Sequence, residues 1–208
     1  MVLIPIHTDS VSGALSKVDL PKGLRVVTFN SRNKDNKDIA NFKQRSNSFL
    51  TTLSLDELQT QFEAFVKQGV AGETCRMYVS LNRRNNKSVI AGLMHKLIDE
   101  PNFPAQAIPQ KAASVGELTS SRAESQWLFD FDGTKERHDI FVRQLTGIIA
   151  RQGHDDMVVT DHRTKNGWAV IVSHGFDTRD LMRLWNDEDE VSLLRDDKLC
   201  VAWANRRK

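Results

Sequence analysis

The first third of the chain predicts one strand and one helix. Residues 24–29 (LRVVTF) form a short apolar run that is typical of a strand. The polar tract at 30–48 has no clear period, and we expect it to be a loop. Ser54 and Glu57 then form the S-x-x-E pattern of a helix start, followed by apolar residues at helical spacing as far as Gly69.

The remaining two thirds predict an alternation of strands and helices. Residues 75–82 read as a strand and 86–98 as an amphipathic helix, whereas the proline-containing stretch 101–125 is expected to be a long connection. From Gln126 onward the pattern becomes regular. The expected elements are strands at 126–131, 157–161, 168–173, 191–194 and 199–203, with helices at 136–151 and around 178–185. This order predicts an α+β fold with a mixed or antiparallel sheet flanked by helices.

Composition and length are those of an ordinary globular protein. The 208 residues are 39% hydrophobic and 27% charged, with a net charge of +2 and two cysteines without a metal-site spacing. No stretch approaches the roughly 18 apolar residues of a membrane span, and the N-terminus lacks the pattern of a signal peptide. We expect a cytoplasmic protein without a membrane partner. We further expect residues 1–70 to be an N-terminal extension with a basic loop and one helix, and residues 71–208 to be the core.

Positive charge is concentrated near the N-terminus. Residues 22–48 contain seven basic side chains and two acidic ones. The basic residues are Lys22, Arg25, Arg32, Lys34, Lys37, Lys43 and Arg45, and the acidic ones are Asp35 and Asp38. Such a segment can attract a polyanion. A solvated basic loop has the same composition, so both interpretations stay open.

Two carboxylates end the strand expected at 126–131. Because side chains alternate faces on a strand, Asp130 and Asp132 lie on one face and the aromatic residues Trp127, Phe129 and Phe131 on the other. Two acids on one face can bind Mg²⁺ or Mn²⁺ and leave coordination positions open for phosphate. The alternative is a strand that simply ends in solvent.

A set of four segments resembles a known family. RMYVSLNRR (76–84), QWLFDFD (126–132), HRTKNGWAVIVSHGFD (162–177) and VSLLRDDKLCVAW (191–203) follow the order found in small tailed-phage proteins. Those proteins are similar to the archaeo-eukaryotic primase superfamily of primase-polymerases. The resemblance covers roughly residues 75–203. It implies an RRM-like catalytic core, a nucleotidyltransferase activity that depends on Mg or Mn, and nucleoside triphosphate and nucleic acid as partners.

The resemblance also implies roles for particular residues. Asp130 and Asp132 match the metal-binding pair of the family, and Asp196 or Asp197 matches its late acidic residue. The residues that would meet nucleotide or nucleic acid are Arg83, Arg84, Lys165, Asn166, Gly167, Ala169 and Arg195. In the turn Lys165–Gly167, backbone N–H groups and a cation suit a phosphate, although N-G is equally a signal for a plain hairpin turn.

One position departs from the family pattern. Ala169 stands where the family has a histidine that contacts the nucleotide phosphates. His174 is five residues further on, and the alternation of a regular strand points it away from the face of Ala169. The chain is therefore expected to be weak or inactive as a transferase.

Two alternatives remain. The first is a non-catalytic relative of that fold, a phage protein that binds nucleic acid or a host protein. If the source is a phage, the location is the host cytoplasm. The second rests on the string DFDGT (130–134), which resembles the nucleophile motif of haloacid dehalogenase-like phosphatases. In those enzymes the motif ends the first strand of a doubly wound parallel sheet.

Overall fold

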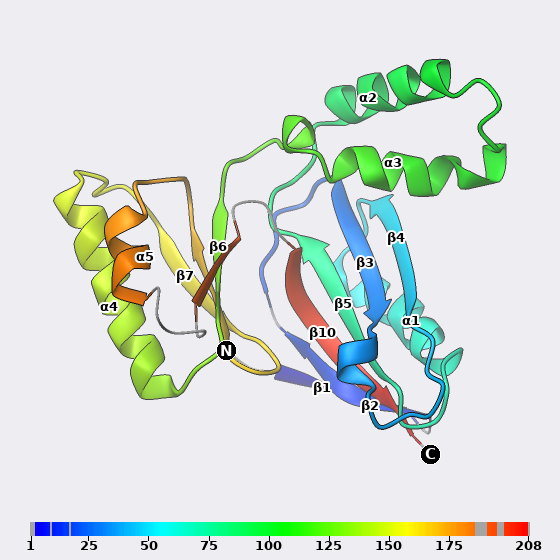
Figure 1. Ribbon diagram of the computed structural model, residues 1–208, viewed down its shortest axis with the longest axis horizontal. Helices are drawn as coiled ribbons and strands as arrows, with labels where there is room; N and C mark the ends of the chain where they lie inside the picture. Colours follow the sequence, from blue (N-terminus) through cyan, green and yellow to red (C-terminus); the bar gives the residue numbers. More distant parts are fainter. Residues whose placement is uncertain (1–2, 9, 17, 186–190, 195–197, 208) are drawn as a thin grey trace.

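The computed structural model describes residues 3–8, 10–16, 18–185, 191–194 and 198–207. It contains two β-sheets with helices on their outer sides (Figure 1). All strand pairs among the described residues are antiparallel. The expected α+β class is confirmed in its antiparallel form. None of the described helices is long and apolar enough to cross a membrane.

The larger sheet combines strands from both ends of the chain. In spatial order its strands are β1 (Leu3–Thr8), β2 (Val11–Ser16), β10 (Lys198–Arg206), β5 (Thr74–Ser80), β3 (Arg25–Ser31) and β4 (Arg45–Thr51). The division expected at residue 70 crosses this sheet, because β5 pairs with β3 on one side and with β10 on the other. Residues 1–70 and the C-terminal strand therefore share one hydrogen-bonded unit.

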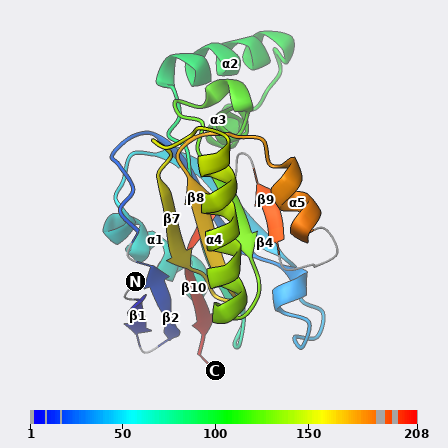
Figure 2. The ribbon, with the colours of Figure 1, turned by 90° about the vertical axis from the view of Figure 1, so that its left-hand side faces the viewer.

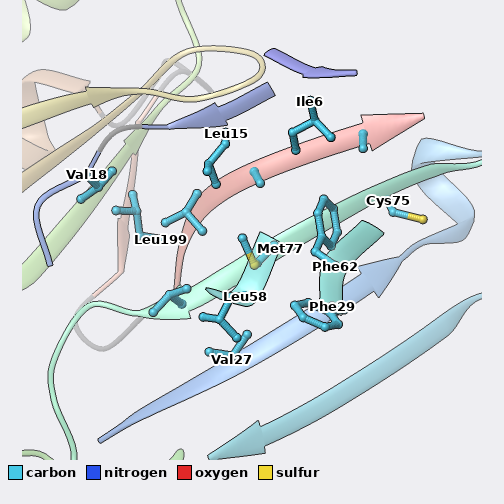
Figure 3. Close-up of a cluster of buried hydrophobic side chains, with 14 of the residues drawn as sticks. Ile6, Leu15, Val18, Val27, Phe29, Leu58, Phe62, Cys75, Met77 and Leu199 are labelled. Carbon is cyan, nitrogen blue, oxygen red and sulfur yellow. The ribbon is translucent and has the colours of Figure 1, made fainter. Parts of the chain in front are cut away.

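Helix α1 (Leu55–Lys67) covers one face of this sheet. Its expected start is confirmed, because the Ser54 hydroxyl accepts a hydrogen bond from the Glu57 N–H and the Glu57 carboxylate accepts one from the Ser54 N–H. The helix buries Phe62 against Phe29 of β3, with ring centroids 5.5 Å apart (Figure 3). Complete burial of such a side chain contributes about 1.5–3 kcal/mol to folding.

The smaller sheet has its own helical layer. Its strands, in spatial order, are β7 (Val159–Arg163), β8 (Trp168–Val172), β6 (Trp127–Phe131) and β9 (Val191–Leu194). Helices α4 (Lys135–Arg151) and α5 (Arg179–Trp185) lie over its outer face (Figure 2). Phe131 and Phe141 pack there with ring centroids 5.4 Å apart. The inner face is directed toward the larger sheet.

Two stretches that we expected to be loops contain regular structure. The expected connection at 101–125 includes helix α3 (Ile108–Gly116), which forms a hairpin with α2 (Asn86–Asp99) beside β3 and β4 (Figure 1). The expected loop at 30–48 runs into β4. Both predictions were wrong there. The second one failed because β4 is an edge strand with little buried surface, so its sequence has no alternation of apolar and polar residues.

Candidate functional site

Asp130 of β6 and Asp132, which follows the strand, line a cleft between the sheets. Phe129 and Phe131 are fully buried in the core beneath α4, whereas Leu128, Asp130 and Asp132 lie on the opposite side of the strand and line the cleft. The predicted separation of acids and aromatic residues onto two faces is therefore confirmed. The cleft has a volume of about 430 Å³, which is within the usual range of small-molecule sites.

Ala169 lies beside the acid pair, as the alternation of β8 predicts. It is paired with Asp130 across the antiparallel ladder and lines the same cleft. His174 lies past the end of β8, where its ring contacts His154 at a centroid distance of 5.4 Å and its Nδ1 is 3.1 Å from the Ser173 hydroxyl. It does not line the cleft. The strand is regular here, so no bulge brings His174 to the position of the family histidine.

The turn between β7 and β8 is held by internal hydrogen bonds. The Gly167 N–H donates to the Thr164 hydroxyl at 3.1 Å, and the Thr164 N–H donates to the Gly167 carbonyl at 2.9 Å. A Cβ atom at Gly167 would collide with the Phe131 carbonyl oxygen, so glycine allows the turn to pack on the end of β6. The Gly167 N–H is thus already used, which leaves a phosphate less backbone to bind than the sequence suggested.

Side chains of this turn still contribute to the cleft. Thr164 and Asn166 are among its lining residues, while Lys165 is not. Burial, followed by the nearby positive charge of Arg76, lowers the pKa of Lys165. Lys165 therefore lies close enough to the opposite sheet to sense its charges.

The opposite wall of the cleft is basic and comes from the larger sheet. Arg32, Lys34 and Lys37 follow β3, and Arg76 projects from β5. We name these four side chains the cationic wall. The sequence marked the tract at 22–48 as basic but did not place it near Asp130, and it gave no role to Arg76.

One carboxylate fixes the two arginines of the cationic wall. Asp35 accepts a hydrogen bond from Arg32 Nε at 2.7 Å and another from an Arg76 terminal nitrogen at 2.6 Å. Burial alone would raise the pKa of Asp35, but the hydrogen bonds and charges of the two arginines outweigh it and lower the pKa. Asp35 is therefore ionised at neutral pH and holds both guanidinium groups at the cleft.

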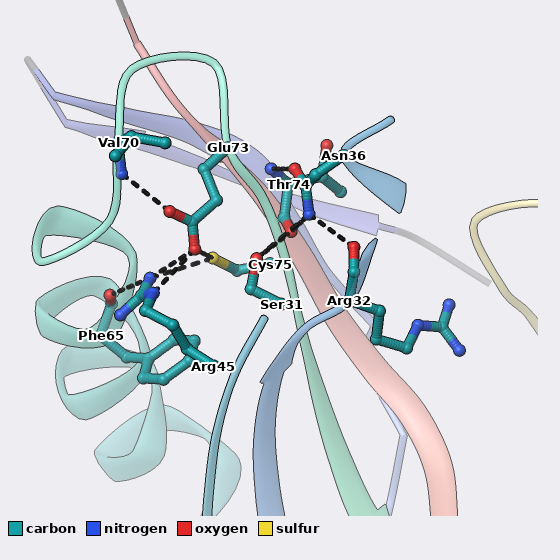
Figure 4. Close-up of polar contacts among 9 residues, drawn as sticks. All are labelled: Ser31, Arg32, Asn36, Arg45, Phe65, Val70, Glu73, Thr74 and Cys75. Atoms are coloured by element: carbon teal, nitrogen blue, oxygen red, sulfur yellow. Dashed lines mark hydrogen bonds and ion pairs between the residues drawn. The ribbon is translucent and has the colours of Figure 1, made fainter. Parts of the chain in front are cut away.

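A buried asparagine attaches the basic segment to the ends of β3 and β5 (Figure 4). Asn36 is only 4% exposed. Its Oδ1 accepts from the Thr74 N–H at 2.6 Å, and its Nδ2 lies within 3.1 Å of the Ser31 hydroxyl and of the Arg32 and Thr74 carbonyl oxygens. These bonds fix the backbone on both sides of Arg32, so the cationic wall is ordered before any ligand binds.

Several predicted residues lie elsewhere. Arg83 forms an ion pair with Glu124 and does not line the cleft. Arg84 is buried and pairs with Arg122 through a backbone bridge. These two arginines connect the α2–α3 hairpin to the end of β5 rather than lining the cleft. Arg195, Asp196 and Asp197 lie outside the described residues.

The charges of the cleft suit an anion that carries a metal. Two carboxylates, Asp130 and Asp132, are on one wall, the cationic wall with Asp35 is on the other, and Lys198 of β10 also lines the cleft. No group of three metal-ligating side chains is found among the residues that the structure describes. Two carboxylates fit Mg²⁺ or Mn²⁺, because such ions commonly keep several water or phosphate ligands and need few from the protein. Asp130 and Asp132 would supply two of the ligands of such an ion.

A second hollow lies on the α1 side of the larger sheet. It is larger, about 970 Å³, and is lined by apolar residues together with three acidic and two basic side chains. One of those acids, Glu57, is already hydrogen-bonded to Ser54 as part of the α1 cap. We therefore regard the smaller cleft, where acids and cations face each other, as the candidate site.

Comparisons with known proteins leave the family undecided. No protein-family model matches the chain, and no curated protein matches its sequence.

Proposed function

We propose that the cleft binds a nucleoside triphosphate together with Mg²⁺ or Mn²⁺, and that the protein is a primase-polymerase-like nucleotidyltransferase. The observation that carries this proposal is the position of Asp130 and Asp132 opposite the cationic wall across one cleft. A metal-bound triphosphate needs both features, because its metal prefers carboxylate oxygens and its phosphates prefer arginine and lysine.

Each group has a defined task in this proposal. Asp130 and Asp132 hold the metal, which supplies Lewis-acid stabilisation of the transferring phosphoryl group. Arg76, Lys34 and Lys37 bind phosphate oxygens and neutralise the charge that develops on them. In the transfer itself, a bond forms between a 3′-oxygen and the α-phosphorus, the bond from that phosphorus to the bridging oxygen breaks, and pyrophosphate leaves. The hydroxyl proton passes to solvent.

The finer fold assignment belongs to the same proposal. A primase-polymerase-like, RRM-like core is supported by the acid pair at the end of a central antiparallel strand, with β8 beside it and the Thr164–Gly167 turn packed on its end. Asp196 and Asp197 would supply the late acid of the family, and Arg195 and Lys165 additional positive charge.

A non-catalytic nucleic-acid-binding protein is the second candidate. The observation that favours it is Ala169, which offers only a methyl group where the family histidine would reach the phosphates. The phosphatase alternative finds no such support. Its nucleophile strand belongs to a parallel sheet, whereas β6 pairs in antiparallel fashion with both β8 and β9.

The two candidates are separated by measuring binding and turnover on the same sample. Titration with ATP and Mn²⁺, followed by extension of a primed DNA or RNA template, should give metal-dependent binding and metal-dependent nucleotide addition. Binding of single-stranded nucleic acid without any addition would favour the second candidate. Absence of ATP binding at all metal concentrations would contradict the proposed function.

The cationic wall gives a direct prediction. Replacing Lys34 and Lys37 with glutamine should weaken binding of ATP with Mn²⁺ about tenfold and reduce its salt dependence, because two phosphate-facing charges are lost. Replacing Lys43 and Lys87, which lie outside the cleft lining, removes the same charge and should leave affinity within about twofold. Equal losses in both pairs, measured by calorimetric titration, would reduce the effect to overall charge.

A further inference from the structure

One aromatic ring lies on the floor of the cleft. Tyr78 projects from β5 on the same side as Arg76, and of the described residues that line the cleft it alone carries an aromatic ring. It is also the single tyrosine of the chain. Burial raises its pKa to about 12, so the ring is uncharged at neutral pH.

A planar cation lies over this ring. The guanidinium carbon of Arg32 is 5.9 Å from the centre of the Tyr78 ring. Arg32 is held at Nε by Asp35, and its backbone carbonyl is bonded to Asn36. Figure 4 shows its side chain extending away from these buried contacts. The ring and the guanidinium group are therefore neighbours on the surface of the cleft.

We propose that Tyr78 and Arg32 form the nucleobase subsite of the cleft, with the base stacked between the phenol ring and the guanidinium plane. This inference rests on the proposed function and names the part of the nucleotide that each wall holds. The base lies on Tyr78 and the phosphates lie between Arg76 and the acid pair.

The spacing is close to what a stacked base needs. A base stacked between the two groups needs a van der Waals contact of about 3.5 Å with each of them, and the Arg32 guanidinium carbon now lies 5.9 Å from the centre of the Tyr78 ring, so the guanidinium group must move outward. The Arg32 side chain is 25% exposed, so we expect it to turn outward when a base binds, with its hydrogen bond to Asp35 lengthened and its backbone still attached to Asn36. The subsite therefore opens slightly without rearranging β3 or β5.

Stacking rather than base-edge recognition sets the expected selectivity. Every base has a π face, so aromatic and arginine platforms bind bases with little regard to sequence. We expect ATP, GTP, CTP and UTP to bind with similar affinity. Inorganic tripolyphosphate, which has the phosphates but no base, should bind through the metal and the cationic wall alone.

The test compares ATP with tripolyphosphate, both with Mg²⁺, in four proteins. Tyr78→Leu removes the ring and should weaken ATP binding about 5- to 150-fold while leaving tripolyphosphate binding unchanged. Tyr78→Phe keeps the ring and should bind ATP like the wild type. Arg32→Lys keeps the charge but loses the planar face, so it should lose ATP affinity and retain tripolyphosphate affinity.

A spectroscopic readout on the wild-type fold complements the variants. Because the chain has one tyrosine, incorporation of 3-fluorotyrosine gives one ¹⁹F resonance, which reports on Tyr78 directly. ATP should shift this resonance and tripolyphosphate should shift it much less.

The possible outcomes distinguish the base subsite from metal-dependent phosphate binding. Unchanged ATP affinity in Tyr78→Leu, or equal ¹⁹F shifts with both ligands, would overturn the base subsite while leaving metal-dependent phosphate binding intact. If the wild type binds neither ATP nor tripolyphosphate with Mg²⁺, the proposed function itself fails.

Discussion

Replacing Asp130 and Asp132 together with asparagine is expected to abolish the stabilisation that Mn²⁺ gives to the protein. A ligand that binds only the native state stabilises it by about 2.7 kcal/mol at a concentration one hundred times its Kd. For a chain of this length that corresponds to a rise in Tm of roughly 5–10 °C. Both carboxylates line the cleft, and asparagine is similar in shape but uncharged, so the fold should survive while metal binding is lost.

A matched double variant controls for the loss of two negative charges. Asp155 and Asp156 are exposed residues between α4 and β7 that do not line the cleft. Changing both to asparagine should leave the Mn²⁺-dependent rise in Tm intact, as measured by differential scanning fluorimetry. If the Asp130/Asp132 variant keeps the full rise, the pair is an ordinary strand end in solvent.

Removal of Glu73 is expected to cause a large loss of stability. Its side chain is only 1% exposed and accepts hydrogen bonds from Arg45 Nε at 2.9 Å, from an Arg45 terminal nitrogen at 2.6 Å and from the Val70 N–H at 2.7 Å (Figure 4). Glu73→Ala leaves the Arg45 charge and the Val70 N–H without these partners. Breaking a buried pair in this way costs about 3 kcal/mol or more, to be measured by urea denaturation.

A surface pair and the pH dependence provide the controls. Glu100 forms an ion pair with Lys111 but is about half exposed, so Glu100→Ala should cost less than about 1 kcal/mol.

Burial alone would raise the pKa of Glu73, but its hydrogen bonds and Arg45 outweigh this and lower the pKa below its ordinary value of 4.5. Its contribution is therefore complete above pH 4.5 and is lost as the pH falls through the lowered pKa. If Glu73→Ala and Glu100→Ala lose similar amounts of unfolding free energy, this account of Glu73 is wrong.

Local signals predicted the elements whose sequences carry their own patterns. Ser54 and Glu57 satisfy each other at the start of α1 without help from the rest of the chain. The strand β6 shows the same independence, because alternation alone assigned Phe129 and Phe131 to the core and Asp130 and Asp132 to the other face. Where a segment lacks such a pattern, as in β4, the sequence predicted a loop.

Long-range pairing decided what the sequence left open. β4 is a strand because its backbone hydrogen-bonds to β3, and no residue within it specifies that partner. The three strands β3, β5 and β10 meet only through the register of the larger sheet, and this register places Tyr78 opposite both Thr28 and Cys200. Strand order is set by tertiary packing, so local patterns did not predict it.

The acid pair and the cationic wall were each predicted from local sequence, but their position relative to each other was not. The sequence by itself determined that Asp130 and Asp132 share a face and that residues 22–48 are basic, because both are properties of neighbouring residues. Only the tertiary structure brought them together, about one hundred residues apart along the chain, and added Arg76, Asp35 and Tyr78. The physical reason is that the packing of one sheet on the other, together with the bonds of Asn36 to Thr74, positions this wall, and both join residues that are far apart in the sequence.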